Sequence, residues 1–155
     1  MWLEKKILVP TDFSEPAVAA ANAGLELARE FHLPLVLTHV YGIPGQKYAG
    51  VDLNLTADFV RSVESAARAA LNEEAARLSH AGVNISVVLS EGVPWERILE
   101  TAKSVDAGLI VMGTHGRRGV PRAVLGSVAE RIVRLSRIPV LTIRESAHAE
   151  QTSGS

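Results

Sequence analysis

Glycines and a serine in the last third of the chain stand at a spacing that suits phosphate binding. Two residues separate Gly113 from Gly116, and nine more separate Gly116 from the pair Gly126-Ser127. Glycine lets the backbone approach an oxyanion closely and adopt positive φ angles, so Gly113 should let the chain turn sharply off the apolar run that precedes it. An amphipathic helical run follows the last glycine. A strand that ends in a glycine loop ahead of a helix N-terminus can bind an anion, and the pattern therefore predicts a bound nucleotide.

Short apolar runs alternate with helical patterns along the chain, and this order predicts the elements that position the glycines. The predicted strands are 6–10, 35–40, 83–89, 109–112 and 139–144, and the predicted helices begin near 14, 56, 94 and 128. Five strands that alternate with four helices are typical of an α/β fold with a parallel, doubly wound, Rossmann-like sheet. We expect the strand order 3-2-1-4-5, flanked by the helices. Ligands of such sheets bind where the strand order reverses, so the loops after the first and fourth strands should meet at one crevice.

Local signals set the ends and faces of the predicted helices. Ser14 can cap the first helix. Small residues recur along one face of that helix, Gly24 among them, and should let it lie close against the sheet. Gly82 is placed to terminate the longest helix, over 56–81. The segment 41–55 is long for a loop in a compact domain, and we expect it to be variable.

Composition limits the classes of function. The chain has 155 residues, which suits one domain over 1–145 followed by a polar tail over 146–155 that we expect to be disordered. Sixteen basic and seventeen acidic side chains give a formal net charge of −1, which argues against nucleic-acid or membrane-surface binding. The absence of cysteine excludes disulfides, thiol catalysis and thiolate metal sites. No apolar run approaches the roughly 20 residues of a membrane span, and the charged N-terminus is unlike a signal peptide, so we expect a cytoplasmic protein.

The chain resembles the universal stress proteins of the ATP-binding type over residues 6–144. The Gly-x2-Gly-x9-Gly-Ser spacing matches the nucleotide motif of that family without a gap. The opening segment 9–14 and the closing segment 138–144 are also similar to the family. Three such segments in the right order are more specific than a lone glycine pattern. The resemblance implies an ATP-binding domain that acts as a stress-response regulator or sensor.

The resemblance also implies roles for individual residues. Asp12 should accept hydrogen bonds from the ribose hydroxyls, which an ionised carboxylate does strongly, and Val40 should contact the adenine. Ser127 offers a hydroxyl and an N–H at a helix start, where the dipole favours anions. Arg117 and Arg118 could neutralise phosphate charge. The expected nucleotide-binding residues are Pro10, Thr11, Asp12, Val40, Met112, Gly113, Thr114, His115, Gly116, Arg117, Arg118, Gly119, Gly126, Ser127, Val128 and Ala129.

Each of these assignments has a structural alternative that the sequence leaves open. Asp12 could serve only the first helix, as a cap or through the helix dipole, and Val40 could be plain core. The glycines could form a merely flexible connection, and the arginines could lie solvated at the surface. His39, inside a predicted strand, is more typical of a hydrogen-bonded core histidine than of a ligand. Trp95 is more typical of packing than of base stacking.

The nucleotide is expected to be held rather than rapidly consumed. No Walker A lysine sequence, dinucleotide Gly-x-Gly-x-x-Gly, clear Mg²⁺-binding carboxylate or evident water-activating base accompanies the glycines. We therefore expect ATP, with or without Mg²⁺, and slow hydrolysis at most; AMP is the alternative resident ligand. The competing functions are an ATPase or phosphotransferase, a dimerisation module without nucleotide, and a flavodoxin-like electron carrier, whose phosphate loop would follow the first strand.

The last predicted strand, 139–144, suggests self-association. It ends the fold as a short apolar edge with unpaired backbone groups. The family resemblance implies that Val140–Ile143 pairs antiparallel with the same strand of a second chain, which gives an isologous C₂ homodimer. A covered or twisted edge in a monomer is the alternative.

Overall fold

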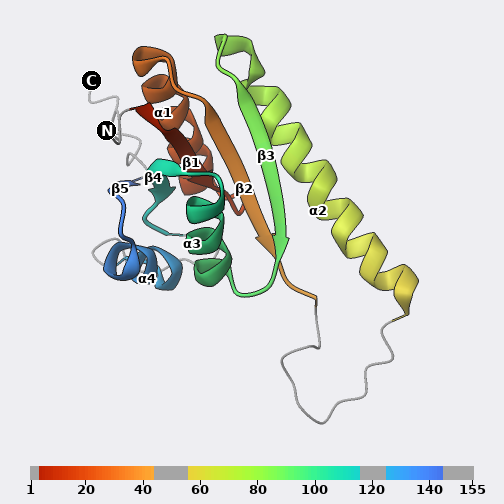
Figure 1. Cartoon of the computed structure of the whole chain (residues 1–155). Helices are drawn as coiled ribbons and strands as arrows, with labels where there is room; N and C mark the ends of the chain where they lie inside the picture. The colour runs from red at the N-terminus through yellow and green to blue at the C-terminus, as the bar shows by residue number, and fades with distance from the viewer. Residues whose placement is uncertain (1–3, 44–55, 116–124, 145–155) are drawn as a thin grey trace, which may run out of the picture.

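The computed structural model describes residues 4–43, 56–115 and 125–144, which form a parallel five-stranded sheet with helices on both faces (Figure 1). The strand order is β3-β2-β1-β4-β5, and every neighbouring pair is parallel. The predicted fold class and strand order are confirmed. The strands are β1 (Lys6–Pro10), β2 (Leu35–Tyr41), β3 (Ile85–Glu91), β4 (Ala107–Gly113) and β5 (Val140–Ile143).

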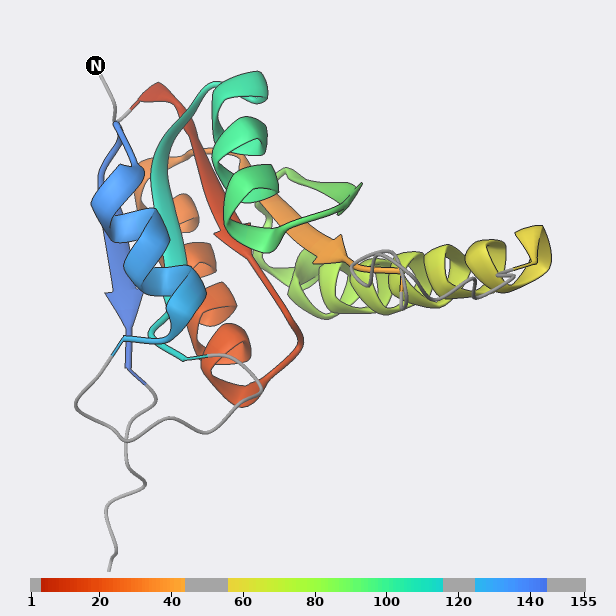
Figure 2. The same ribbon diagram turned by 90° about the horizontal axis from the view of Figure 1, so that it is seen from below.

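The four described helices cover the two faces of the sheet in pairs (Figures 1 and 2). Helices α1 and α2 pack over one face, and α3 and α4 pack over the other. None of the described helices is long and apolar enough to cross a membrane. The helices are α1 (Glu15–Phe31), α2 (Ala57–Leu78), α3 (Pro94–Ser104) and α4 (Ser127–Leu135), and the 3₁₀ turn η2 (Ser79–Ala81) follows α2.

The central strands are apolar on both sides because helices cover both faces of a parallel sheet. In β1, Ile7 and Val9 belong to the core beneath α1 and α2, whereas Leu8 belongs to the core beneath α3 and α4. All three side chains are at most 1% exposed. The same alternation holds in β4, where Val111 and Ile110 lie in opposite layers. Packing on both sides fixes β1 and β4, and with them the loops at their carboxyl ends.

Helix α1 lies close against β1 because its inward face is built from small residues. A Cβ added to Gly24 would lie 2.7 Å from the Cγ2 atom of Val9, nearer than real Cβ atoms approach. Ser14 caps the helix, since its hydroxyl accepts a hydrogen bond from the Ala17 N–H at 3.4 Å. Both sequence predictions for this helix are confirmed.

Some predicted boundaries were wrong by a few residues. The helix expected over 56–81 ends at Leu78, because its last turn tightens into the 3₁₀ turn Ser79–Ala81. Gly82 then takes the left-handed conformation, with φ 72°, as expected of a terminating glycine. The third strand begins at Ile85, two residues later than expected, because its pairing with β2 starts there.

Several sequence predictions lie outside the described residues. They concern most of the variable segment 41–55, the tail 146–155 and part of the phosphate loop. The division into one domain over 1–145 likewise stays a prediction. The phosphate-loop residues concerned are Gly116, Arg117, Arg118 and Gly119.

Candidate functional site

The loops after β1 and β4 leave the sheet at the same end, where the strand order reverses. β1 and β4 are parallel neighbours, so their carboxyl ends lie together. The two connections touch directly: a Cβ added to Gly113 would lie 2.9 Å from the backbone carbon and oxygen of Pro16 in α1. The last residue of β4 therefore contacts the first turn of α1. This is the point of a doubly wound sheet where ligands bind.

Gly113 is needed for this close contact, because a side chain at this position would meet the backbone of Pro16. The sequence predicted that Gly113 lets the chain turn sharply off the strand, and the chain does bend at the next residue, Thr114. Among the described glycines, those with positive φ are Gly82 and Gly92, so the missing side chain of Gly113, and not a left-handed backbone angle, is what lets α1 approach.

Asp12 lies in a short turn that is fastened to the start of α1. Its Oδ1 atom accepts hydrogen bonds from the Ser14 N–H, at 3.0 Å, and from the Ser14 hydroxyl. Ser14 is itself the N-cap of α1, so the capping alternative describes part of what Asp12 does. An ionised carboxylate accepts up to about four hydrogen bonds. Support of the helix and contact with a ribose are therefore compatible roles, and the ribose contact stays a prediction.

Thr11, Phe13 and His39 give the Asp12 turn its shape. Thr11 Oγ1 accepts a hydrogen bond from the Phe13 N–H at 3.0 Å, and the Thr11 N–H donates to the Thr38 carbonyl at 2.8 Å. Phe13 has a left-handed φ of 65°, which is uncommon for a bulky residue. His39 contacts both neighbours of Asp12: its Nδ1 lies 2.7 Å from the Thr11 carbonyl oxygen, and its ring centroid lies 4.6 Å from that of Phe13. The prediction of a hydrogen-bonded His39 is confirmed, but nothing in the sequence identified its partner.

Thr114, just after β4, and Gly126, just before α4, are hydrogen-bonded to each other. Thr114 is 5% exposed and donates its N–H to the Ile143 carbonyl of β5 at 3.1 Å. The Thr114 carbonyl accepts a hydrogen bond from the Gly126 N–H at 2.7 Å. This hydrogen bond holds the start of α4 beside the end of β4.

The first turn of α4 presents backbone N–H groups without a side-chain cap. Gly126 is the N-cap residue and makes no side-chain hydrogen bond to the helix. The N–H groups of Ser127, Val128 and Ala129 belong to the first turn, where no intrahelical carbonyl is available to them. Ser127 is exposed, whereas Ala129 is buried. With the positive end of the helix dipole, these groups form a site of the kind that binds a phosphate oxygen.

His115 carries a buried polar atom beside this turn. Its Nδ1 lies 3.0 Å from Thr114 Oγ1. Its Nε2 is buried and has no hydrogen-bond partner among the residues that the structure describes. A buried nitrogen in this state would gain free energy from a ligand group that bonds to it, which supports keeping His115 in the candidate site.

Three of the predicted site residues contribute to the core of the sheet. Val40 and Met112 pack in the cluster beneath α3 and α4, and Pro10 is also buried. Core packing is what the described contacts show for them, and their contact with a nucleotide stays a prediction. Trp95 packs in the same cluster, with the guanidinium carbon of Arg131 at 5.1 Å from its ring centroid. Its predicted packing role is confirmed.

Tyr41 and the possible metal-binding groups bear on what chemistry the described part of this end of the sheet could perform. Burial raises the pKa of Tyr41, which ends β2, and the charges of Glu64 and Glu91 raise that pKa further while Arg68 lowers it. The Tyr41 hydroxyl therefore stays protonated at neutral pH and is not a base. Within 4–43, 56–115 and 125–144, no group of three or more His, Cys, Asp or Glu side chains could hold a metal ion.

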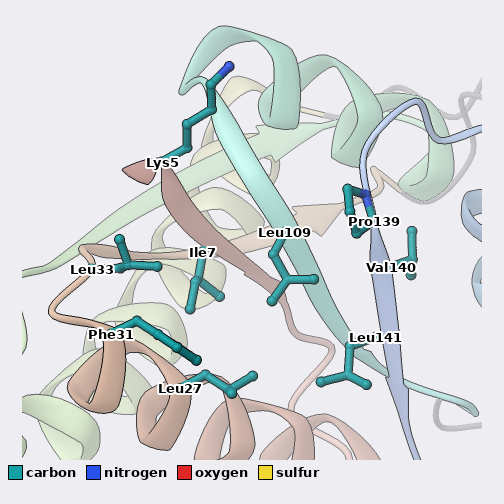
Figure 3. A pocket seen from close by; sticks show the side chains of 9 residues that line it. All are labelled: Lys5, Ile7, Leu27, Phe31, Leu33, Leu109, Pro139, Val140 and Leu141. Carbon is teal, nitrogen blue, oxygen red and sulfur yellow. The ribbon is translucent and has the colours of Figure 1, made fainter. Parts of the chain in front are cut away.

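A separate apolar groove of about 320 Å³ lies at the opposite end of the sheet (Figure 3). Lys5 precedes β1 and Pro139 precedes β5, so the groove follows the amino ends of the strands. Lys5 is its charged member and is paired with Asp106 at 2.8 Å. This lining does not suit phosphates. The groove has no signature in the sequence, because only tertiary packing unites its residues, which are Lys5, Ile7, Leu27, Phe31, Leu33, Leu109, Pro139, Val140 and Leu141.

The family model and the similar proteins described next all represent universal stress proteins. The model of the Universal stress protein family matches residues 4–144. Universal stress protein MJ0531 of Methanocaldococcus jannaschii is 33% identical over 144 residues, which cover 92% of this chain and 84% of that relative. The solved structure of universal stress protein UspA from Lactobacillus plantarum is 25% identical, with a TM-score of 0.77 over 90% of this chain and 97% of that one. A solved universal stress protein in complex with cAMP is also 25% identical, with a TM-score of 0.68 over 91% and 97% of the two chains.

The family match and the fold agree along the chain. The matched region begins before β1 and ends after β5, so it contains the whole sheet and all four described helices. The region aligned with the M. jannaschii relative covers most of both chains. The chain therefore belongs to the universal stress protein family.

Proposed function

We propose that this universal stress protein is a cytoplasmic, nucleotide-binding stress-response regulator or sensor that holds ATP and hydrolyses it slowly at most. The observation that carries the proposal is the meeting of three parts at one end of the sheet: the Asp12 turn, the end of β4 at Gly113, and the start of α4 at Gly126. Contact with Pro16 joins the first two parts, and the hydrogen bond from Gly126 to Thr114 joins the last two. A carboxylate suited to ribose hydroxyls and N–H groups suited to phosphates are thus held on one scaffold.

In the proposed complex each part of the nucleotide has its own contacts. The start of α4 and the glycine segment would bind the phosphates, Asp12 the ribose, and Val40 the adenine. His115 Nε2, which has no hydrogen-bond partner among the described residues, would bond to the phosphates. The proposed binding residues are Pro10, Thr11, Asp12, Val40, Met112, Gly113, Thr114, His115, Gly116, Arg117, Arg118, Gly119, Gly126, Ser127, Val128 and Ala129.

The relative in complex with cAMP supports an adenine nucleotide as the class of ligand. Adenine, ribose and a phosphate are common to cAMP, AMP and ATP. We propose ATP for this chain, with Mg²⁺ on its phosphates if a metal ion takes part, and AMP as the alternative. We propose that the chain holds ATP and does not hydrolyse it rapidly, because the glycine segment follows the fourth strand and lacks the Walker A lysine. The competing function, an ATPase or phosphotransferase, would require that bound ATP be consumed and that substitution of one identified general base abolish this reaction.

ATP is expected to stabilise the folded chain strongly. At about 100 times its dissociation constant, a ligand that binds only the native state raises the free energy of unfolding by roughly 2.7 kcal/mol. Urea denaturation at increasing ATP, with and without Mg²⁺, measures this rise, and the same titration with AMP separates the two candidate ligands. GTP is the matched control, because it supplies the same phosphates without adenine. An unfolding midpoint that does not move in millimolar ATP or AMP would contradict the proposed function.

We propose further that the chain forms a homodimer through β5. Among the described strands β5 has one neighbour, β4, so its outer edge is a template for pairing with another strand. The apolar groove beside this edge exposes 39% of Leu141 and 49% of Phe31. A strand of four residues supplies little of the roughly 800 Å² that each partner buries in a standard interface. We therefore assign the groove to the same contact, with a second copy of the chain as its occupant.

A further inference from the structure

We infer that His39 is a positioning residue for nucleotide binding: it holds the turn that carries Asp12, so that the carboxylate meets the ribose hydroxyls. The inference rests on the proposed function and adds a residue to it. His39 contacts the residues on both sides of Asp12, namely Thr11 and Phe13.

The hydrogen bond from His39 fixes the backbone just before Asp12. A carbonyl oxygen can only accept, so the His39 Nδ1 atom, 2.7 Å from the Thr11 oxygen, carries the proton and donates it. The Thr11 N–H donates to the Thr38 carbonyl of β2, and the Thr38 hydroxyl donates to the Val88 carbonyl of β3 at 2.9 Å. Thr11 and Thr38 are 5% and 0% exposed. Thr11, the residue before Asp12, is therefore hydrogen-bonded to β2 through both its own N–H and its own C=O.

The aromatic contact from His39 supports the backbone just after Asp12. A left-handed conformation is unfavourable for a bulky residue such as Phe13, and it persists only where its surroundings impose it. The imposing contacts here are the Phe13 N–H bond to Thr11 Oγ1 and the ring of His39, which is tilted by 49° against the Phe13 ring. Since the chain direction at Phe13 sets where Asp12 can bond to Ser14, the His39 ring helps to set the carboxylate as well.

His39 acts through the turn and not on the base of the nucleotide. Side chains alternate between the two faces of a strand. Val40, the proposed adenine contact, lies in the core layer of α3 and α4, whereas Phe13, the partner of the His39 ring, lies in the layer of α1 and α2. His39 is thus on the face opposite Val40, so loss of its donor should affect the ribose contact selectively.

The test compares two His39 variants and two nucleotides by calorimetric titration. His39→Phe keeps a ring against Phe13 but removes the donor, and His39→Asn keeps a donor near the position of Nδ1. The ligands are ATP and 2′,3′-dideoxy-ATP, which lacks the hydroxyls that Asp12 would bind. Hydrogen bonds to a charged group are worth roughly 1.5–3 kcal/mol, so we expect the wild type to prefer ATP over the dideoxy analogue by about tenfold or more.

His39→Phe should lower the affinity for ATP by about tenfold and change the affinity for the dideoxy analogue by less than about twofold, which removes most of the preference for ATP. His39→Asn should retain most of it. In an Asp12→Ala background, His39→Phe should have no further effect on ATP, because the two residues act through one contact. Urea denaturation of each variant confirms that it is folded.

Three results would overturn the inference while ATP still binds the wild type. The first is that His39→Phe lowers the affinities for ATP and for the dideoxy analogue equally, and the second is that His39→Phe prefers ATP over the analogue as strongly as the wild type does. The third is that the wild type itself does not prefer ATP over the analogue. A wild type that binds neither nucleotide contradicts the proposed function itself, and the inference falls with it.

Discussion

Gly113→Val is expected to lower the free energy of unfolding by about 3 kcal/mol or more and to abolish ATP binding. Even the first added carbon would lie 2.9 Å from the backbone carbon and oxygen of Pro16. These are atoms of α1 itself and cannot rotate away as a side chain could. α1 must therefore move off β4, which also separates the Asp12 turn from the start of α4. Urea denaturation measures the loss of stability, and titration with ATP measures the loss of binding.

Gly42→Ala is the matched control for this substitution. No atom lies within 4 Å of a Cβ added to Gly42, and its φ is not positive. A Gly→Ala change at such a position leaves stability unchanged or raises it by about 0.4–1 kcal/mol, because it restricts the unfolded chain. Equal stability of Gly113→Val and the wild type would show that β4 and α1 are not in the close contact on which the site depends.

Leu141→Glu is expected to convert the proposed dimer into a monomer. Leu141 is part of both β5 and the groove, so pairing through β5 would bury the new carboxylate without a partner. An unpaired charge buried in an interface costs roughly 3–5 kcal/mol, which raises the dimer dissociation constant at least about 100-fold. The folded monomer should tolerate the change, because Leu141 is already 39% exposed. Sedimentation equilibrium of the two proteins measures the difference.

Leu135→Glu is the control for the dimer experiment. Leu135 is 45% exposed and ends α4, outside the groove. It should leave the dissociation constant within about twofold of the wild-type value, as expected for a surface change away from the interface. A wild-type chain that sediments as a monomer at high concentration would refute the dimer. Equal effects of the two substitutions would refute the placement of the interface.

Patterns that repeat along the chain predicted the architecture. Alternating apolar runs and helical patterns gave the strand order, because helices on both faces leave few other arrangements for such strands. The small residues of α1, such as Gly24, also predicted that this helix lies close against the sheet. The errors lie at the ends of elements. At the end of α2, for example, Ser79–Ala81 forms a 3₁₀ turn, and the residue types in this segment do not predict it.

The sequence predicted which backbone segments form the candidate site but not the side-chain and packing contacts between them. The Gly-Ser pair correctly marked the start of α4, since an N-cap and first turn depend on local residues. The reason for Gly113 could not be read from the sequence, because Pro16 is distant in the chain and only the packing of α1 brings it near. The same holds for His39 and Thr11, which come from different strands. The apolar groove draws on α1, β1, β4 and β5 and has no local signature.

The most direct measurement of the central claim is the map of amide chemical shifts during titration with ATP. Saturable changes should concentrate at the two ends of the candidate site, in residues 11–14 and in 113–115 with 126–129. Amides at the apolar groove, such as those of Phe31 and Leu141, should stay unchanged as ATP saturates, because the groove lies at the opposite end of the sheet. Changes centred on the groove, or no changes in millimolar ATP, would contradict an ATP site at the carboxyl ends of β1 and β4.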